Sequence, residues 1–123
     1  MRVLLDECLP RKLKFALPEH EVRSAQQEGW GGLRNGVLLQ VASAGFDVFL
    51  TVDRNIEFQQ NLQGLPIAIV AMVVPSNRLG DLLPMVGQVR AALARAKPGT
   101  VTRVGDIAVR EHVPGYRFSR SAA

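Results

Sequence analysis

The chain has 123 residues, of which 47% are apolar and 21% charged, and its formal net charge is +4. This composition is typical of a globular protein with a buried core. The length predicts one domain and is too short for two. The single cysteine, Cys8, excludes an internal disulfide or a thiolate metal cage. The longest apolar run, residues 67–74, is too short to span a bilayer, and Asp6 and Glu7 interrupt any leader-like stretch. We therefore expect a cytoplasmic protein with no membrane partner.

Strand and helix patterns alternate along the chain. Val3, Leu4 and Leu5 are consecutive apolar residues, which is typical of a strand buried on both faces of a parallel sheet. Asn35 and Gly45 are expected to cap the two ends of the second helix. The predicted elements, in order, are residues 2–7 (strand), 9–17 (helix), 20–24 (strand), 35–45 (helix), 48–51 (strand), 56–62 (one or two helical turns), 67–74 (strand), 77–97 (helix) and 100–104 (strand).

This alternation predicts an α/β protein with a mainly parallel sheet of four or five strands and helices on both faces. The strongly apolar segment 67–74 is expected at the centre of the sheet, and segments 20–24 and 100–104 at its edges. The last helix either runs on through Pro84 or begins near it after an irregular turn. The turn after the first strand has no glycine, which disfavours a phosphate-cradling dinucleotide loop.

Residues 1–111 are expected to form the domain and residues 112–123 a C-terminal tail. Trp30, among glycines, either stacks on a base or covers the core, and burial is favoured because tryptophan usually buries most of its surface. Cys8 is expected to be a packed small residue rather than a nucleophile, because no His or Lys beside it in sequence lowers its pKa.

Two aspartates, Asp6 and Asp53, follow the first and third predicted strands. If these strands are neighbours, the two Cα atoms lie within about 10 Å at the edge where ligands of open α/β sheets gather. Two carboxylates so close repel each other unless a cation joins them, and Mg²⁺ or Mn²⁺ prefers oxygen ligands. Such an ion can activate water and stabilise charge on a phosphodiester. The alternative is that both acids merely cap helices or face solvent.

The charge is uneven along the chain. Residues 1–60 contain seven Lys or Arg and eight Asp or Glu, whereas residues 61–123 contain eight and three. An acidic site beside a basic surface suits an enzyme that acts on a polyanion, although scattered surface arginines give the same counts. Arg11, Arg34 and Arg54 lie near the predicted site and are candidates to hold a nucleic-acid backbone.

Three short segments carry a resemblance to a known family. Residues 4–10 read LLDECLP, residues 35–42 read NGVLLQVA, and residues 48–55 read VFLTVDRN, with Phe58 following. The first resembles the LLDENLP opening, and the others the DxxILxxA…VLLTxDRDF block, of small PIN-like proteins related to VapC-type toxin ribonucleases. The resemblance implies a three-layer, Rossmann-like PIN-like fold, an acidic pocket with Mg²⁺ or Mn²⁺, and often cleavage of single-stranded RNA.

The resemblance also assigns roles to individual residues. Asp6 and Asp53 match catalytic acids that bind the metal, and Thr51 matches the hydroxyl residue that supports Asp53. Two family acids fall on Asn35 and Asn55, where an amide oxygen can ligate a cation but adds no charge. Asn35 therefore either contributes its side-chain oxygen to the site or only caps its helix, and Asn55 is equally compatible with a turn.

Glu7 and Glu57 are the acids available to compensate for these losses. The leading hypothesis is a metal-dependent PIN-like endoribonuclease, the toxin of a toxin–antitoxin pair, with single-stranded RNA and a cognate antitoxin as partners. The alternative is a catalytically weakened PIN-like module that binds nucleic acid or a partner protein without cleavage. A third hypothesis, a receiver-like module that is phosphorylated on Asp53, lacks a lysine at residues 71–74. The predicted edge strand at residues 100–104 would also allow a homodimer.

Overall fold

The computed structural model describes residues 1–52 and 66–105, apart from the side chain of Asn35. In these residues five parallel strands form one sheet in the order β2-β1-β3-β4-β5. The strands are β1 (Arg2–Leu5), β2 (Glu21–Ser24), β3 (Val48–Thr51), β4 (Ala68–Val73) and β5 (Val101–Gly105). The helices are α1 (Asn35–Ala42), α3 (Leu79–Leu82) and α4 (Val86–Arg95), with 3₁₀ segments η1 (Arg11–Ala16) and η2 (Leu83–Met85).

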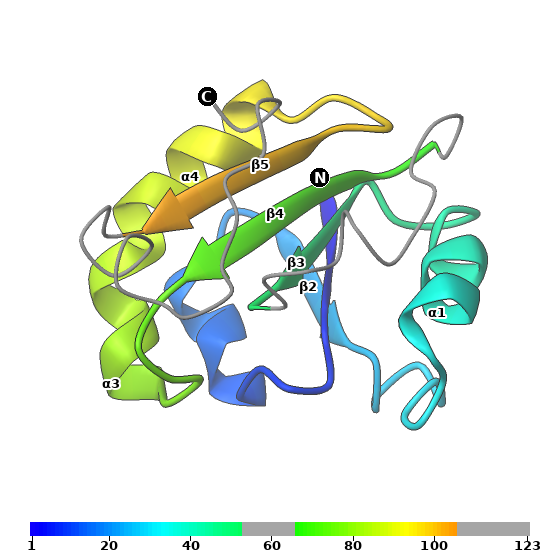
Figure 1. Ribbon diagram of the computed structural model, residues 1–123, viewed down its shortest axis with the longest axis horizontal. Coiled ribbons are helices and arrows are strands. Elements are labelled where there is room, and N and C mark those ends of the chain that lie inside the picture. Colours follow the sequence, from blue (N-terminus) through cyan, green and yellow to red (C-terminus); the bar gives the residue numbers. More distant parts are fainter. Residues whose placement is uncertain (53–65, 106–123) are drawn as a thin grey trace.

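Helices cover both faces of the sheet, with α1 on one side and α3 and α4 on the other (Figure 1). Alternate strand residues therefore enter two separate cores. Leu5, Leu50 and Val70 belong to the core beneath η1, α3 and α4, whereas Leu4 and Phe49 belong to the core beneath α1. Burying one such side chain stabilises the fold by about 1.5–3 kcal/mol. The predicted three-layer α/β architecture is confirmed, and burial on both faces explains the continuous apolar runs.

The first strand and the segment after it are shorter than predicted. β1 ends at Leu5, and Asp6 begins a turn in which the Leu9 N–H donates to the Asp6 carbonyl at 3.0 Å. The helix expected at residues 9–17 is the 3₁₀ segment η1, which buries Leu13 against the sheet.

The caps predicted for the second helix are wrong. Arg34 is the N-cap residue of α1, Asn35 is its first helical residue, and Ser43 is the C-cap. Gly45 has no positive φ. Its backbone is instead approached by Arg2, whose guanidinium donates to the Gly45 carbonyl, and a Cβ there would lie 3.1 Å from a guanidinium nitrogen.

The remaining elements differ in detail from the sequence pattern. The segment predicted at residues 77–97 is divided into α3, η2 and α4, with Pro84 in η2, which is the second of the two expected forms. β4 is interior, but β3 is the middle strand, so the central position expected for residues 67–74 is wrong. β2 and β5 lie at the edges as predicted. The turns predicted at residues 56–62 and the start of the tail at residue 112 lie outside the described residues.

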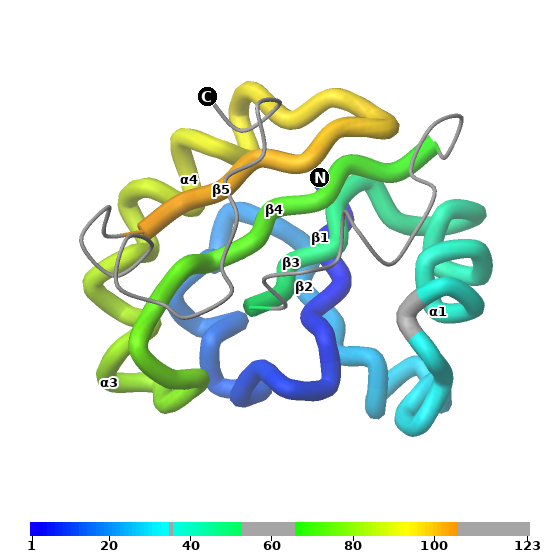
Figure 2. The backbone as a smooth tube through the Cα atoms, viewed as in Figure 1, coloured from blue at the N-terminus to red at the C-terminus, as the bar shows by residue number. Residues whose placement is uncertain are grey.

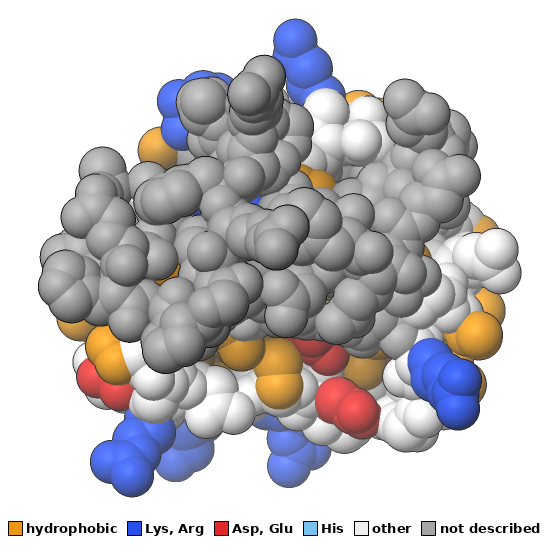
Figure 3. Space-filling view, in the orientation of Figure 1, with side chains coloured by type: hydrophobic (Ala, Val, Ile, Leu, Met, Phe, Trp, Pro, Cys, Tyr) orange, Lys and Arg blue, Asp and Glu red, His pale blue; other side chains and the backbone are white. Residues whose placement is uncertain are grey.

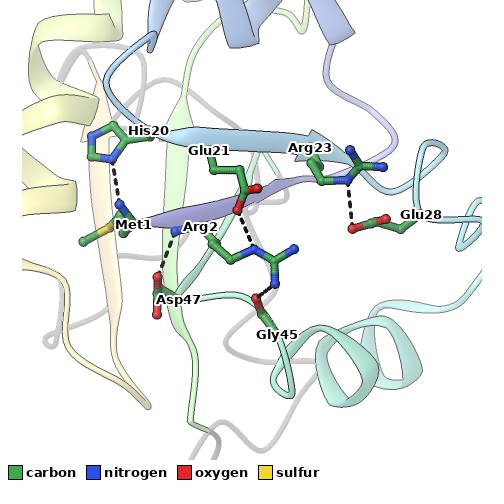
Figure 4. A network of polar contacts seen from close by, with 8 residues as sticks. All are labelled: Met1, Arg2, His20, Glu21, Arg23, Glu28, Gly45 and Asp47. Atoms are coloured by element: carbon green, nitrogen blue, oxygen red, sulfur yellow. Dashed lines mark hydrogen bonds and ion pairs between the residues drawn. The ribbon is translucent and has the colours of Figure 1, made fainter.

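A polar network joins the amino ends of the strands (Figure 4). The Arg2 N–H donates to Asp47 Oδ2 at 2.8 Å, and Arg2 Nε donates to Glu21 Oε2 at 2.7 Å. The Arg2 guanidinium also lies 4.5 Å from the centre of the Phe46 ring. Each exposed ion pair contributes little by itself, but together they fix β1 against β2 and the turn before β3.

Candidate functional site

The strand order reverses between β1 and β3. β2 lies on one side of β1, whereas β3, β4 and β5 follow on the other side. The carboxyl ends of the two strands at such a reversal form the usual ligand-binding crevice of a doubly wound sheet. The expectation that the first and third strands are neighbours is confirmed, with Leu4 opposite Phe49 and Leu5 opposite Leu50 (Figure 2).

Asp6 and Thr51 meet at this reversal. The Asp6 N–H donates to the Leu50 carbonyl at 3.0 Å, which extends the β1–β3 ladder and places Asp6 opposite Thr51. The Thr51 hydroxyl donates to Asp6 Oδ2 at 2.6 Å. Asp6 is 5% exposed and Thr51 is 0% exposed, so this bond holds the carboxylate where little water can compete. The structure shows the Thr51 hydroxyl bound to Asp6, and the support of Asp53 that the resemblance assigned to it falls on a residue outside the described ranges.

The thiol of Cys8 lies against the same pair of side chains. Burial, and then the negative charge of Asp6, raise the pKa of Cys8 from 9.0 to about 11. The thiol is therefore protonated at neutral pH and is a poor nucleophile, in agreement with the packed role expected for it. Asn77 Nδ2 donates to the Cys8 carbonyl at 2.8 Å and joins this turn to the segment before α3.

Glu7 faces the glycine-rich loop rather than Asp6. Glu7 Oε2 accepts a hydrogen bond from the Gly32 N–H at 2.8 Å, and Gln26 Nε2 donates to the Glu7 carbonyl at 3.1 Å. Gly32 has a φ of +88°, a conformation that favours glycine and brings its N–H to the carboxylate. Glu7 thus binds the loop in this structure instead of supplying a second carboxylate beside Asp6.

Trp30 covers the core on the α1 side. Its ring lies 6.0 Å from that of Phe46 at an interplanar angle of 76°, an edge-to-face contact. The backbone N–H of Trp30 donates to the Ala25 carbonyl at 2.8 Å. These contacts agree with the burial that the sequence favoured over base stacking.

The described residues provide part of a metal site. Asp6 is a carboxylate ligand at the crevice, and an oxygen ligand suits Mg²⁺ or Mn²⁺. Within residues 1–52 and 66–105, no three His, Cys, Asp or Glu side chains are grouped so that they could hold a metal ion. The described residues thus fit one side of such a site and do not complete it. Five residues of the predicted site and of the family resemblance lie outside the described residues: Asp53, Arg54, Asn55, Glu57 and Phe58.

Two predicted RNA-binding residues flank the crevice from opposite faces. Arg11 begins η1, which follows β1, and Arg34 precedes α1, which follows β2. Both arginine side chains are exposed. In the space-filling view, acidic side chains are exposed near the bottom of the molecule, with Lys and Arg side chains along the rim around them (Figure 3). This charge arrangement is compatible with a polyanionic ligand.

One buried charged residue in the middle of β5, Arg103, is not apparent from the sequence. The register places Arg103 opposite Ala71, and Ala71 opposite Thr51. Arg103 therefore shares a cross-strand row with Asp6, although it lies on the far edge strand and is only 7% exposed. The only indication of it in the sequence is that a charged residue stands within a strand rich in β-branched residues.

A shallow pocket of about 190 Å³ lies at the opposite, amino edge of the sheet. Its lining includes Met1, Asp47, Ala68 and Pro98. None of the predicted site residues lines this pocket, so it is separate from the crevice at Asp6.

The fold and the crevice define a doubly wound, three-layer α/β protein with a buried Asp–Thr pair where the strand order reverses. No protein-family model, curated protein or solved structure matches the chain. The PIN-like assignment therefore rests on the sequence resemblance. None of the helices in the described ranges is long and apolar enough to cross a membrane.

Proposed function

We propose that this protein is a metal-dependent PIN-like endoribonuclease that acts in the cytoplasm as the toxin of a toxin–antitoxin pair. The observation that supports this most directly is the buried Asp6–Thr51 pair at the β1–β3 reversal. The resemblance supplies the reaction class, the Mg²⁺ or Mn²⁺ ion, single-stranded RNA as substrate and an antitoxin as partner.

In this proposal Asp6 is a metal ligand that Thr51 holds in position. Asp53, two residues after Thr51 in the chain, is the second acidic ligand, and Asn35 contributes a side-chain oxygen. When bound, the cation supplies charge neutralisation and an activated water for hydrolysis of the phosphodiester. Arg11 holds the RNA backbone through its charge.

Cleavage of a mixed-sequence single-stranded RNA with Mn²⁺ tests the proposal. Asp6→Asn keeps the size of the side chain and an acceptor for the Thr51 hydroxyl, and it should lower the cleavage rate at least about a hundredfold. The matched control is Asp47→Asn, because Asp47 is an exposed acid at the opposite edge of the same sheet. It should retain the wild-type rate, and EDTA should abolish cleavage by all active forms. Equal rates for wild type and Asp6→Asn would remove Asp6 from the mechanism.

The second candidate is a PIN-like module that binds RNA or a partner protein without cutting. Amides at Asn35 and Asn55, in the places of two family acids, favour it. This candidate predicts RNA binding that weakens with salt, survives EDTA and shows no turnover. Arg11→Gln and Arg34→Gln should each weaken such binding. Turnover that depends on Mn²⁺ and on Asp6 would exclude it.

A further inference from the structure

We infer that the outer surface of η1 holds single-stranded RNA beside the crevice, with one base stacked on the exposed ring of Phe15 and the neighbouring phosphates against Arg11 and Lys12. This inference rests on the proposed function for the identity of the ligand, single-stranded RNA. It adds the place where the strand is held outside the reacting centre, and it assigns Phe15 no role in the chemical step.

The ring of Phe15 is open to solvent. Phe15 is 72% exposed, and among the described residues it is the most exposed of the large apolar side chains. The other described aromatic residues, Trp30, Phe46 and Phe49, belong to the core beneath α1 or pack against it. Lys14 Nζ lies 5.3 Å from the centre of the Phe15 ring. An exposed aromatic ring beside a cation is the arrangement on which the bases of single strands stack, because every base has a flat π face.

The 3₁₀ geometry of η1 places its side chains in three rows, because residues three apart lie above one another. One row packs against the core and two rows face outward. The inner row is Leu13 and Ala16, and the outer rows are Lys12 with Phe15 and Arg11 with Lys14. A cation therefore precedes the aromatic ring in its own row, and two more cations form the row beside it.

The cations of η1 are available to phosphates. Three of the six residues in Arg11–Ala16 are Lys or Arg, and none is acidic. Within residues 1–52 and 66–105 none of these three cations forms an ion pair, whereas Arg2, Arg23 and Arg90 each pair with a glutamate. Binding of a phosphate to η1 therefore breaks no ion pair of the described residues, and it releases the counterions that these cations attract on the phosphates.

The surface of η1 begins at the crevice. β1 ends at Leu5, Asp6 begins the following turn, and Arg11 is the first residue of η1 after that turn. At about 2 Å per residue, Phe15 lies about 8 Å beyond Arg11 along the segment. A strand with one phosphate at Asp6 can therefore continue over Arg11 and place a base from a neighbouring nucleotide on Phe15.

The mixture of charged and aromatic side chains favours RNA over a protein partner. The centre of a protein interface is depleted in charged residues, whereas surfaces that bind single strands combine aromatic rings with cations that follow the backbone. The outward neighbours of Phe15 within η1 are Arg11, Lys12 and Lys14. An apolar partner surface that covered Phe15 would also desolvate these charges, whereas a single strand brings a phosphate for each of them.

The test measures binding of a mixed-sequence single-stranded RNA to the full chain in EDTA, so that no cleavage occurs. Phe15→Leu keeps an apolar side chain but removes the π face, and it should weaken RNA binding roughly tenfold. Phe15→Tyr keeps a ring that stacks and should bind RNA as the wild type does. The matched control is Val37→Ala, because Val37 is 48% exposed on α1, which covers the opposite face of the sheet (Figure 1). It should leave RNA binding unchanged.

Two further measurements separate stacking from charge. Inorganic polyphosphate carries the charge of RNA but no bases, so Phe15→Leu should bind it as the wild type does, whereas Lys12→Gln should bind both ligands more weakly. Lys12→Gln removes one phosphate contact and should reduce the slope of log K against log salt concentration by about 0.7. Phe15→Leu should leave that slope unchanged.

RNA binding by Phe15→Leu that equals wild-type binding would overturn the inference. Equal weakening of RNA and polyphosphate binding by Phe15→Leu would also overturn it, because the ring would then act without a base. If Phe15 instead contacts a protein, such as a second copy of the chain, Phe15→Leu should reduce self-association in sedimentation and leave RNA binding intact, which counts against stacking. Circular dichroism checks folding, and Phe15→Ala replaces a Phe15→Leu protein that does not fold.

The wild-type measurements report separately on the proposed function. A wild type that does not bind RNA ends both proposals. A wild type that cleaves RNA with Mn²⁺, with no loss of binding in Phe15→Leu, ends only this inference. A wild type that binds RNA through Phe15 but does not cleave it ends the endoribonuclease proposal and leaves the RNA surface on η1 standing.

Discussion

Removing the Thr51 hydroxyl is the most direct test of how Asp6 is held. Thr51→Val keeps the shape of a side chain that is 0% exposed and removes the donor 2.6 Å from Asp6 Oδ2. The Asp6 carboxylate, at 5% exposure, has little water to replace that donor. Because hydrogen bonds to charged groups contribute about 1.5–3 kcal/mol, we expect the free energy of unfolding at pH 7 to fall by about 2 kcal/mol.

A double-mutant cycle separates this bond from other effects of the substitution. Asp6→Asn replaces the charged acceptor with a neutral one, and a neutral bond contributes only about 1 kcal/mol. Thr51→Val should therefore cost about 1 kcal/mol less in the Asp6→Asn background than in the wild type. Thr51→Ser keeps the hydroxyl and should lose only about 1 kcal/mol, for the missing methyl group.

Urea unfolding followed by circular dichroism measures these differences. With a slope of about 1–3 kcal/mol per molar urea, a loss of 2 kcal/mol lowers the midpoint by about 1 M. The reasoning would be refuted if the free energy of unfolding of Thr51→Val lay within about 0.5 kcal/mol of the wild-type value, since substitutions at the surface have effects of that size. An equal cost in both backgrounds would show that Thr51 stabilises the fold through a group other than the Asp6 carboxylate.

Gly105→Ala should destabilise the protein by roughly 2–4 kcal/mol, because Gly105 has a φ of +140° and a Cβ there would lie 2.1 Å from the Val73 carbonyl oxygen. The control is Gly87→Ala, because Gly87 lies in α4 with open space around it, and this substitution should stabilise the protein by up to about 1 kcal/mol. Equal shifts of the melting temperature in the two variants would contradict this. Cys8, with its pKa raised from 9.0 to about 11, should react with iodoacetamide at pH 8 roughly a hundredfold more slowly than in the unfolded chain, and a rate equal to that of the unfolded chain would contradict the burial. Because the folded-state pKa is the higher one, Cys8 should stabilise the fold fully below pH 9 and lose that contribution as the pH rises through about 11, a dependence that Cys8→Ala removes.

The sheet was predictable because its signals are local. Consecutive apolar residues at Val3 to Leu5 and at residues 67–74 indicate strands buried on both faces, and both segments form interior parallel strands. The ends of α1 were not predictable in the same way. Gly45 looked like a helix cap, but its surroundings depend on Arg2, whose guanidinium reaches it from another element. Local sequence does not contain that contact.

The site was predictable only in part, for the same physical reason. An acid directly after a buried strand identifies Asp6 as a candidate, because the carboxyl end of a parallel strand faces the ligand edge. Its bond to Thr51 requires β1 and β3 to be neighbours, which depends on the strand order of the whole sheet. The sequence alone does not determine that strand order, so the neighbourhood of β1 and β3 had to be assumed.

Arg103 shows how strongly the edge depends on register. It lies on the α1 face because Val101, two residues before it, pairs with Ile69, which in turn pairs with Phe49 in the core beneath α1. A slip of one residue between β4 and β5 would turn Arg103 to the α4 face of the sheet. Gly105 opposes such a slip, since it pairs with Val73 at a backbone approach too close for any other residue. The glycine that ends β5 therefore also fixes the position of the charge two residues before it.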